Sequence, residues 1–220
     1  MPPAHSGIRG GVRAILPLLP AALAFGVSFG VLAVAAGMHS VAAIAMSATT
    51  FAGSAQFATV SVLGAGGGLA AAVAAALLLN ARYGAISVAV GSAFRGRLWR
   101  RLAESQLIVD ESWAVSVRPG GRVEHRVLIG AGAALWLAWT AGTAVGAFAG
   151  DALGDPEALG LDGAFPALFL ALMVPQLRSR RARAAALGGA AIATALVPFV
   201  PAGVPIVAAA AACVVGWRRP

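Results

Sequence analysis

The sequence predicts an all-α fold, a polytopic bundle of membrane helices with about six full spans plus one or two broken or re-entrant helices. Of its 220 residues, 60% are hydrophobic and only 11% are charged, and the mean hydropathy is +0.86. A soluble domain of this length needs more polar residues to cover its core. No Lys, Arg, Asp or Glu occurs from Ala14 to Ala81, a block several times the roughly 20 apolar residues of one spanning helix.

The positions of the basic residues predict how the chain lies in the membrane. All 16 are arginines, and most cluster between apolar runs, at 9 and 13, 95–101, 118–126, 178–183 and 218–219. Arginine-rich loops belong on the cytoplasmic side. The net charge of +8 is therefore explained without nucleic acid as a partner. We expect one transmembrane domain over residues 1–220, in the cytoplasmic membrane, with both termini in the cytoplasm.

The expected helices follow from the apolar runs. The run 14–36 is too long for the core of a cleaved signal peptide, so it is a retained first span. The connection 150–163 carries four acidic residues and no arginine, which places it outside. In chain order, the runs cover 14–36, 41–63, 69–94, 127–149, 163–177, 184–200 and 203–217, with a shorter, mixed segment at 102–117.

Charge parity indicates that one of the first three runs does not cross. Arginines precede the first run and follow the third, and both groups belong inside, so the number of crossings between them is even. The run 41–63 contains "FAGSAQF" (51–57), and we predict a broken or re-entrant helix there, facing protein or a water-filled cavity. The segment 102–117 is expected to dip in and return, or to lie along the surface. The alternative is seven or eight full spans.

Glycines four residues apart indicate close helix packing. Gly26 and Gly30 have this spacing, and so do Gly142 and Gly146, and Gly146 and Gly150. Small residues at this spacing let two helix backbones approach closely. They serve packing within the bundle or a docking face for another membrane subunit.

Three polar clusters could bind a solute at membrane depth. A broken helix exposes N–H groups that suit an anionic group, so Gly53, Ser54 and Gln56 are predicted to bind substrate. The alternative is that Ser54 and Gln56 bond to a neighbouring helix. Asn80 and Arg82 are the second cluster, and Arg82 lies roughly 12 residues, or about 18 Å, from either end of its run.

A charge at that depth is a functional-site hypothesis, and a guanidinium suits a carboxylate. The third cluster, Asp110 and Glu111, could meet an ammonium, carry a proton or form an ion pair with Arg82 that serves only the fold. Neighbours on a helix point about 100° apart, so both carboxylates face one site only if the helix breaks there. They could also form an exposed acidic turn.

The sequence shows no pattern that is typical of a metal-binding protein or an enzyme. With Cys213 alone and three scattered histidines, we expect no metal site and no cofactor. "AGSA" has no paired histidine and no phosphate-binding loop occurs, so we expect no enzyme.

The motifs "FAGSAQFA" (51–58), "LLLNARYGAISVAV" (77–90) and "IVDESWAV" (108–115) resemble the AzlC family, the large subunit of branched-chain amino-acid exporters. The resemblance runs from about Gly7 to Val117. It implies a secondary transporter that exports leucine, isoleucine, valine or methionine together with a small AzlD-like membrane subunit. Two residues depart from the family pattern: Tyr83 replaces a histidine, and Val109 replaces a threonine. The first departure puts a histidine proton relay in doubt and can signal a shifted substrate.

Together these observations give the hypothesis of a proton-coupled exporter. Two alternatives stay open: a non-transporting assembly or sensor subunit, and a channel for a small polar solute.

Overall fold

A computed structural model describes residues 6–119, 121–153, 170, 173–174, 177–201 and 204–212, without the side chains of Arg82, Ala85 and residues 150–153. Within these ranges the chain is helical, as predicted. An isolated antiparallel β-bridge also joins Val117 and Val123. Most of the acidic connection and the last arginines, 218–219, lie outside the described residues.

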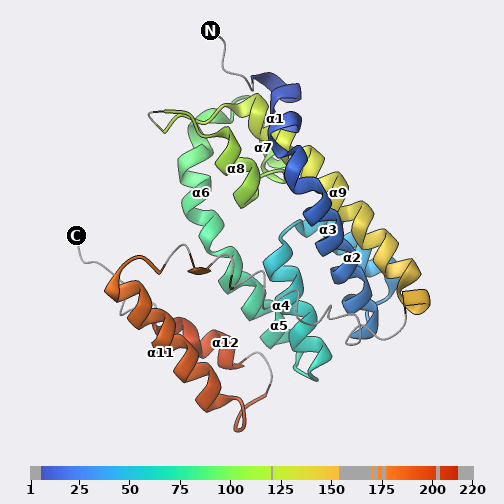
Figure 1. Ribbon diagram of the computed structural model, residues 1–220, viewed down its shortest axis with the longest axis vertical. Coiled ribbons are helices and arrows are strands. Elements are labelled where there is room, and N and C mark those ends of the chain that lie inside the picture. The colour runs from blue at the N-terminus through green and yellow to red at the C-terminus, as the bar shows by residue number, and fades with distance from the viewer. Residues whose placement is uncertain are drawn as a thin grey trace.

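Two long helices lie side by side along one edge of the molecule (Figure 1). The first consists of α1 (Gly7–Ile15), a 3₁₀ turn (Leu16–Leu18) and α2 (Leu19–Ala35), and the second is α9 (His125–Leu153). In the described part of the chain, Gly7–Ala35 and His125–Ala149 are long and apolar enough to cross a bilayer. The count of six full spans stays a prediction.

Glycines hold α2 and α9 in backbone contact. A Cβ added to Gly26 would lie 2.5 Å from the carbonyl oxygen of Trp139, and one added to Gly146 would overlap the carbonyl oxygen of Val27. Gly30 and Gly142 meet the opposite helix in the same way. The prediction of close packing within the bundle is thus confirmed for these four glycines, and their use as a docking face for another subunit is wrong, since the two helices cover each other's glycines.

The same contacts show that the two long helices run parallel. Ile8 faces Gly130 and Val27 faces Gly146, so residue numbers rise together along both helices. The backbone N–H of Gly7 also donates to a carboxylate oxygen of Glu124, at 3.0 Å. Because both helices begin at one end of the molecule, the chain between them must return to that end, as charge parity predicts.

The run 41–63 is broken at the predicted place. Helix α3 (Ser40–Thr50) ends before Phe51, and α4 (Gly53–Gly64) begins two residues later. Phe51 has φ 41° and ψ 51°, in the left-handed region, and Ala52 is non-helical. A bulky residue at positive φ is a strained outlier, which ends the helix sharply.

Shorter helices complete the fold. The run 69–94 is interrupted at Ala81, and the segment 102–117 contains the end of one short helix and the whole of another, joined by residues 106–109. Near the C-terminus, α12 packs on α5 and on α11, and its Ile206 contacts an alanine-rich cluster. The bounds are α5 (Leu69–Asn80), α6 (Arg82–Val90), a 3₁₀ turn (Gly91–Ala93), α7 (Leu98–Ser105), α8 (Asp110–Ser116), α11 (Arg180–Leu196), α12 (Val204–Ala209) and a 3₁₀ turn (Ala210–Ala212).

Two glutamates join separate segments of the chain at the end of the molecule where α1 and α9 begin. Glu104 on α7 lies 2.9 Å from Nε2 of His125 and 2.8 Å from Nε of Arg100. Glu124 accepts hydrogen bonds from Arg118, at 2.7 Å, and from the N–H of Gly7. Partial burial acts to raise the pKa of each carboxyl, but these donors outweigh it and both pKa values lie below the ordinary value.

Acid should therefore weaken this end of the molecule. A carboxyl with a lowered pKa stabilises the fold above its unfolded-state pKa, near 4.5, and that stabilisation is lost as pH falls through the folded value. The expected contribution is about 1 kcal/mol or less for each partly exposed pair. Thermal unfolding in detergent should show a steeper loss of stability below pH 4.5 in the wild type than in a Glu104→Gln, Glu124→Gln variant. Parallel acid profiles would contradict this assignment.

Candidate functional site

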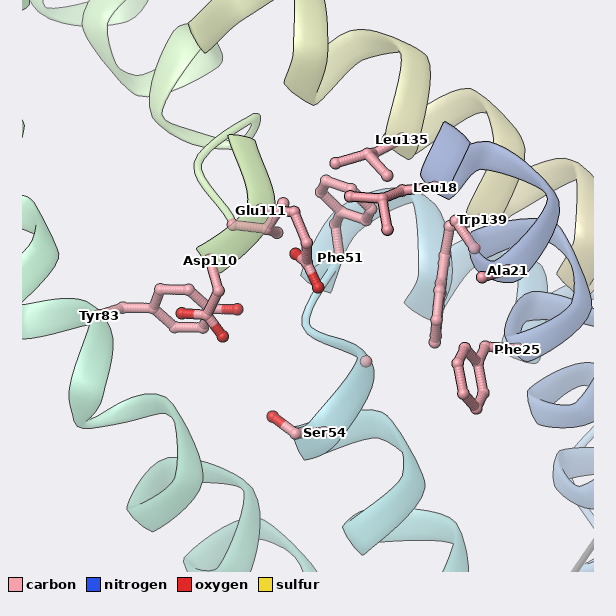
Figure 2. Close-up of a pocket in the computed structure, with 13 residues that line it drawn as sticks. Leu18, Ala21, Phe25, Phe51, Ser54, Tyr83, Asp110, Glu111, Leu135 and Trp139 are labelled. Atoms are coloured by element: carbon pink, nitrogen blue, oxygen red, sulfur yellow. The ribbon is translucent and has the colours of Figure 1, made fainter. Parts of the chain in front are cut away.

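A cavity of about 240 Å³ lies at the break between α3 and α4 (Figure 2). It is bounded by α2 and its preceding turn, the start of α4, α6, α8 and α9. Its lining residues are Leu18, Ala21, Ala22, Phe25, Phe51, Gly53, Ser54, Tyr83, Val109, Asp110, Glu111, Leu135 and Trp139.

One wall of the cavity is apolar. It comes from the first long helix, through Leu18 and Phe25, and from α9, through Leu135 and Trp139. Trp139 belongs to a buried aromatic cluster with Phe29 and Phe57, whose ring centroids lie 6.4 and 6.1 Å from it. This packing makes the wall rigid.

The opposite wall is polar. Ser54 comes from α4, Tyr83 from α6, and Asp110 and Glu111 from α8 (Figure 2). Both acids face one cavity because α8 begins at Asp110, so the chain is not helical on the N-terminal side of the pair.

Val109 holds that helix start in place. It is extended, with φ −130° and ψ 168°, and its N–H donates to Oγ of Ser112 at 2.9 Å. The condition under which Asp110 and Glu111 can share a site is therefore met.

The start of α4 depends on a glycine. A Cβ on Gly53 would lie 2.8 Å from Cη2 of Trp139, so only glycine lets the indole pack against this turn. The first N–H groups of any helix lack intrahelical acceptors and carry partial positive charge. Gly53 and Ser54 bring this end of α4 to the cavity, while Phe51 supplies the sharp bend before it.

Gln56 stabilises the break from within. It is fully buried; its Oε1 accepts from the N–H of Ala52 at 3.3 Å, and its Nε2 donates to Oγ of Ser47 at 2.9 Å. Ser47 lies 2.8 Å from Oγ1 of Thr143, which donates to the carbonyl of Trp139. This series of hydrogen bonds joins α3, α4 and α9. The structure therefore shows Gln56 bonded to a neighbouring helix, which is the alternative to substrate binding. A role of Gln56 in substrate binding stays a prediction.

Replacing Gln56 with leucine should destabilise the protein by about 1–3 kcal/mol, because the buried N–H of Ala52 loses its side-chain acceptor and the hydroxyl of Ser47 loses one of its two partners. The measurement is unfolding in detergent. Thr59→Val is the control, since the hydroxyl of Thr59 is also buried but, among the described residues, bonds only to the carbonyl of Ala55 within α4. Equal stability of Gln56→Leu and wild type would show that the network does not hold the break.

The structure brings together four of the predicted site residues: Gly53, Ser54, Asp110 and Glu111 line the cavity. Gln56 and Asn80 do not line it. Asn80 is half-buried at the end of α5, and among the described residues its Oδ1 has no hydrogen-bond partner. The side chain of Arg82 is outside the described part, but Arg82 begins α6 and is followed by Tyr83, which lines the cavity.

Sequence reasoning did not select Tyr83 or Trp139 as site residues. Tyr83 offered a signal, as the one tyrosine of the chain and the neighbour of Arg82. Trp139 offered none, since it lies in an ordinary apolar run and reaches the cavity only through the packing of α9 against α2.

Comparisons with known proteins agree with the resemblance seen in the motifs. The AzlC protein family matches residues 17–153, which include every lining residue of the cavity. A membrane protein of Archaeoglobus fulgidus, itself uncharacterised, is 32% identical over 212 residues, covering 95% of this chain and 94% of the relative. No solved structure matches significantly. The chain is therefore a membrane protein with a transport-related role, and it belongs to the AzlC family.

Proposed function

We propose that this chain is a secondary transporter that exports leucine, isoleucine, valine and the related methionine across the cytoplasmic membrane, coupled to protons. The observation that carries the proposal is the two-sided cavity, in which carboxylates and a helix start face an apolar wall. Such a site is complementary to a small zwitterion with an aliphatic side chain.

The polar wall would bind the two charges of an amino acid. Asp110 or Glu111 would accept hydrogen bonds from the ammonium group, since charged hydrogen bonds are the strong ones. The N–H groups at the start of α4, with Ser54, would donate to the carboxylate. Arg82 is assigned to the same carboxylate, because a guanidinium at membrane depth needs an anionic partner.

The apolar wall would select the side chain. Leu18, Phe25 and Leu135 offer an aliphatic and aromatic surface, and burial stabilises a branched side chain by about 1.5–3 kcal/mol. The cavity, at about 240 Å³, is smaller than the roughly 300–1,000 Å³ of drug-sized sites. It therefore suits a solute of amino-acid size.

Proton coupling would use the second carboxyl of the pair. The carboxyl that does not bind the ammonium group would carry the proton as substrate enters and leaves the cavity. The broken helix α3–α4 would let the site open to either side, as discontinuous helices do in transporters.

A small AzlD-like subunit completes the proposal. It must dock elsewhere than on Gly26, Gly30, Gly142 and Gly146, because α2 and α9 occupy those faces. Exposed apolar side chains such as Leu137 and Phe148 on α9 leave room for lipid or a partner.

The test is leucine efflux from cells that co-express this chain with the small subunit and are loaded with a leucine-containing dipeptide. Efflux should require this chain, saturate with internal leucine and collapse on addition of an uncoupler. Non-saturating efflux would support a channel instead. No efflux of any of the four amino acids, with the protein confirmed in the membrane, would favour the assembly or sensor subunit.

A further inference from the structure

A second hollow lies apart from the cavity, between the end of α6 and α7. Its volume is about 180 Å³. Phe94, Leu98 and Leu102 form its apolar floor, and Arg101, Ser87 and Ser105 supply its polar groups. A hollow that combines apolar side chains with a guanidinium is complementary to an acyl chain that carries an anionic headgroup.

Helix α7 presents both classes of side chain to the outside. Leu98, Trp99 and Leu102 are 62%, 79% and 50% exposed. Arg95, Arg97 and Arg101 are exposed in the same segment. Basic residues combined with exposed Trp and Leu are typical of a helix that lies in the membrane interface.

The contacts of α7 place it at the level of the lipid headgroups. Glu104, in its last turn, lies 2.9 Å from Nε2 of His125, and His125 is the first residue of the α9 span. The helix therefore lies where the apolar part of α9 begins, at the boundary between hydrocarbon and water. Anionic headgroups are concentrated at this depth on the cytoplasmic side.

We propose that the α6–α7 hollow and the exposed arginines of residues 95–101 bind an anionic phospholipid. The acyl chain lies on Phe94, Leu98 and Leu102, and the phosphate meets Arg101, with Arg95 and Arg97 adding to the attraction. An anionic lipid is favoured over a zwitterionic one because its net negative charge is complementary to the arginines. This proposal does not depend on the transported substrate.

Bound lipid would also bear on the cavity. Residues 106–109 join α7 directly to Asp110, and Nε2 of Gln106 donates to the carbonyl of Thr49 at 2.5 Å, two residues before Phe51. A lipid that holds α7 in the interface thus steadies both the start of α8 and the break after α3.

Trp99 provides a local reporter for the test. The full chain is reconstituted in phosphatidylcholine vesicles that contain the same mole fraction of either brominated phosphatidylglycerol or brominated phosphatidylcholine. Bromine quenches indoles that it touches, and the signal of Trp99 is the difference between the wild type and Trp99→Phe. Trp99 should be quenched more by the brominated phosphatidylglycerol, and the preference should weaken at high salt.

The charge dependence is tested with two variants that lose the same charge. Arg95→Gln, Arg97→Gln, Arg101→Gln should lower the preference for phosphatidylglycerol at Trp99 by at least about tenfold, since each arginine near the surface contributes severalfold. Arg178→Gln, Arg181→Gln, Arg183→Gln removes exposed arginines around the start of α11 and should leave it unchanged. Equal quenching by both lipids in the wild type, no quenching by either, or a preference that survives in the first variant would overturn the proposal.

Discussion

Replacing Gly146 with valine should prevent α2 and α9 from packing and should destabilise the protein by about 3 kcal/mol or more. The side chain would overlap the backbone carbonyl of Val27, and backbone cannot move aside as a flexible side chain can. The two long helices would have to separate along their whole contact, which also includes Gly26, Gly30 and Gly142. The measurement is unfolding in detergent, together with the yield of monodisperse protein.

Gly84→Val is the matched control. Gly84 is a helical glycine of α6, and a Cβ there would meet nothing within 4 Å. The loss of glycine flexibility and the added β-branch are the same in both variants, so the difference between them reports the helix contact alone. Similar stabilities of the two variants would show that α2 and α9 do not pack through their glycines.

Neutralising the acids of the cavity should reduce transport by about 10–100-fold, because a charged hydrogen bond to the substrate is worth about 1.5–3 kcal/mol. Asp110→Asn and Glu111→Gln keep the size of each side chain and remove its charge. The measurement is leucine transport in vesicles by two assays, net efflux driven by a proton gradient and exchange of labelled for unlabelled leucine without one.

The two assays separate the roles of the acids. A variant that fails in both has lost an ammonium ligand, whereas one that exchanges but shows no net efflux has lost proton coupling. Glu104→Gln serves as control, since Glu104 is a carboxylate of the same chain that does not line the cavity. If both cavity variants transport like the wild type in both assays, the acids neither bind substrate nor couple protons.

Several features of this protein could be predicted from the sequence because they are local. A charge-free block of apolar residues makes membrane helices whatever surrounds it. The break at FAGSAQF was also predictable, since polar residues and a glycine interrupt an apolar run whose full crossing would upset charge parity. Likewise, the sequence indicates Asp110 and Glu111 as candidate site residues because they are acids near an apolar run, and both line the cavity.

The tertiary structure alone decided which groups meet. Gln56 and Ser54 are two residues apart in one motif, yet Ser54 lines the cavity. Gln56 is buried in a hydrogen-bond network with Ser47 and Thr143. Successive helical residues point about 100° apart, so the packing of α9 against α2 and α3 determines which of them is exposed to solute. The same packing brings Trp139 to Gly53 across a long stretch of sequence. The sequence by itself thus determined the membrane helices and the site of the break, and tertiary contacts determined the composition of the cavity.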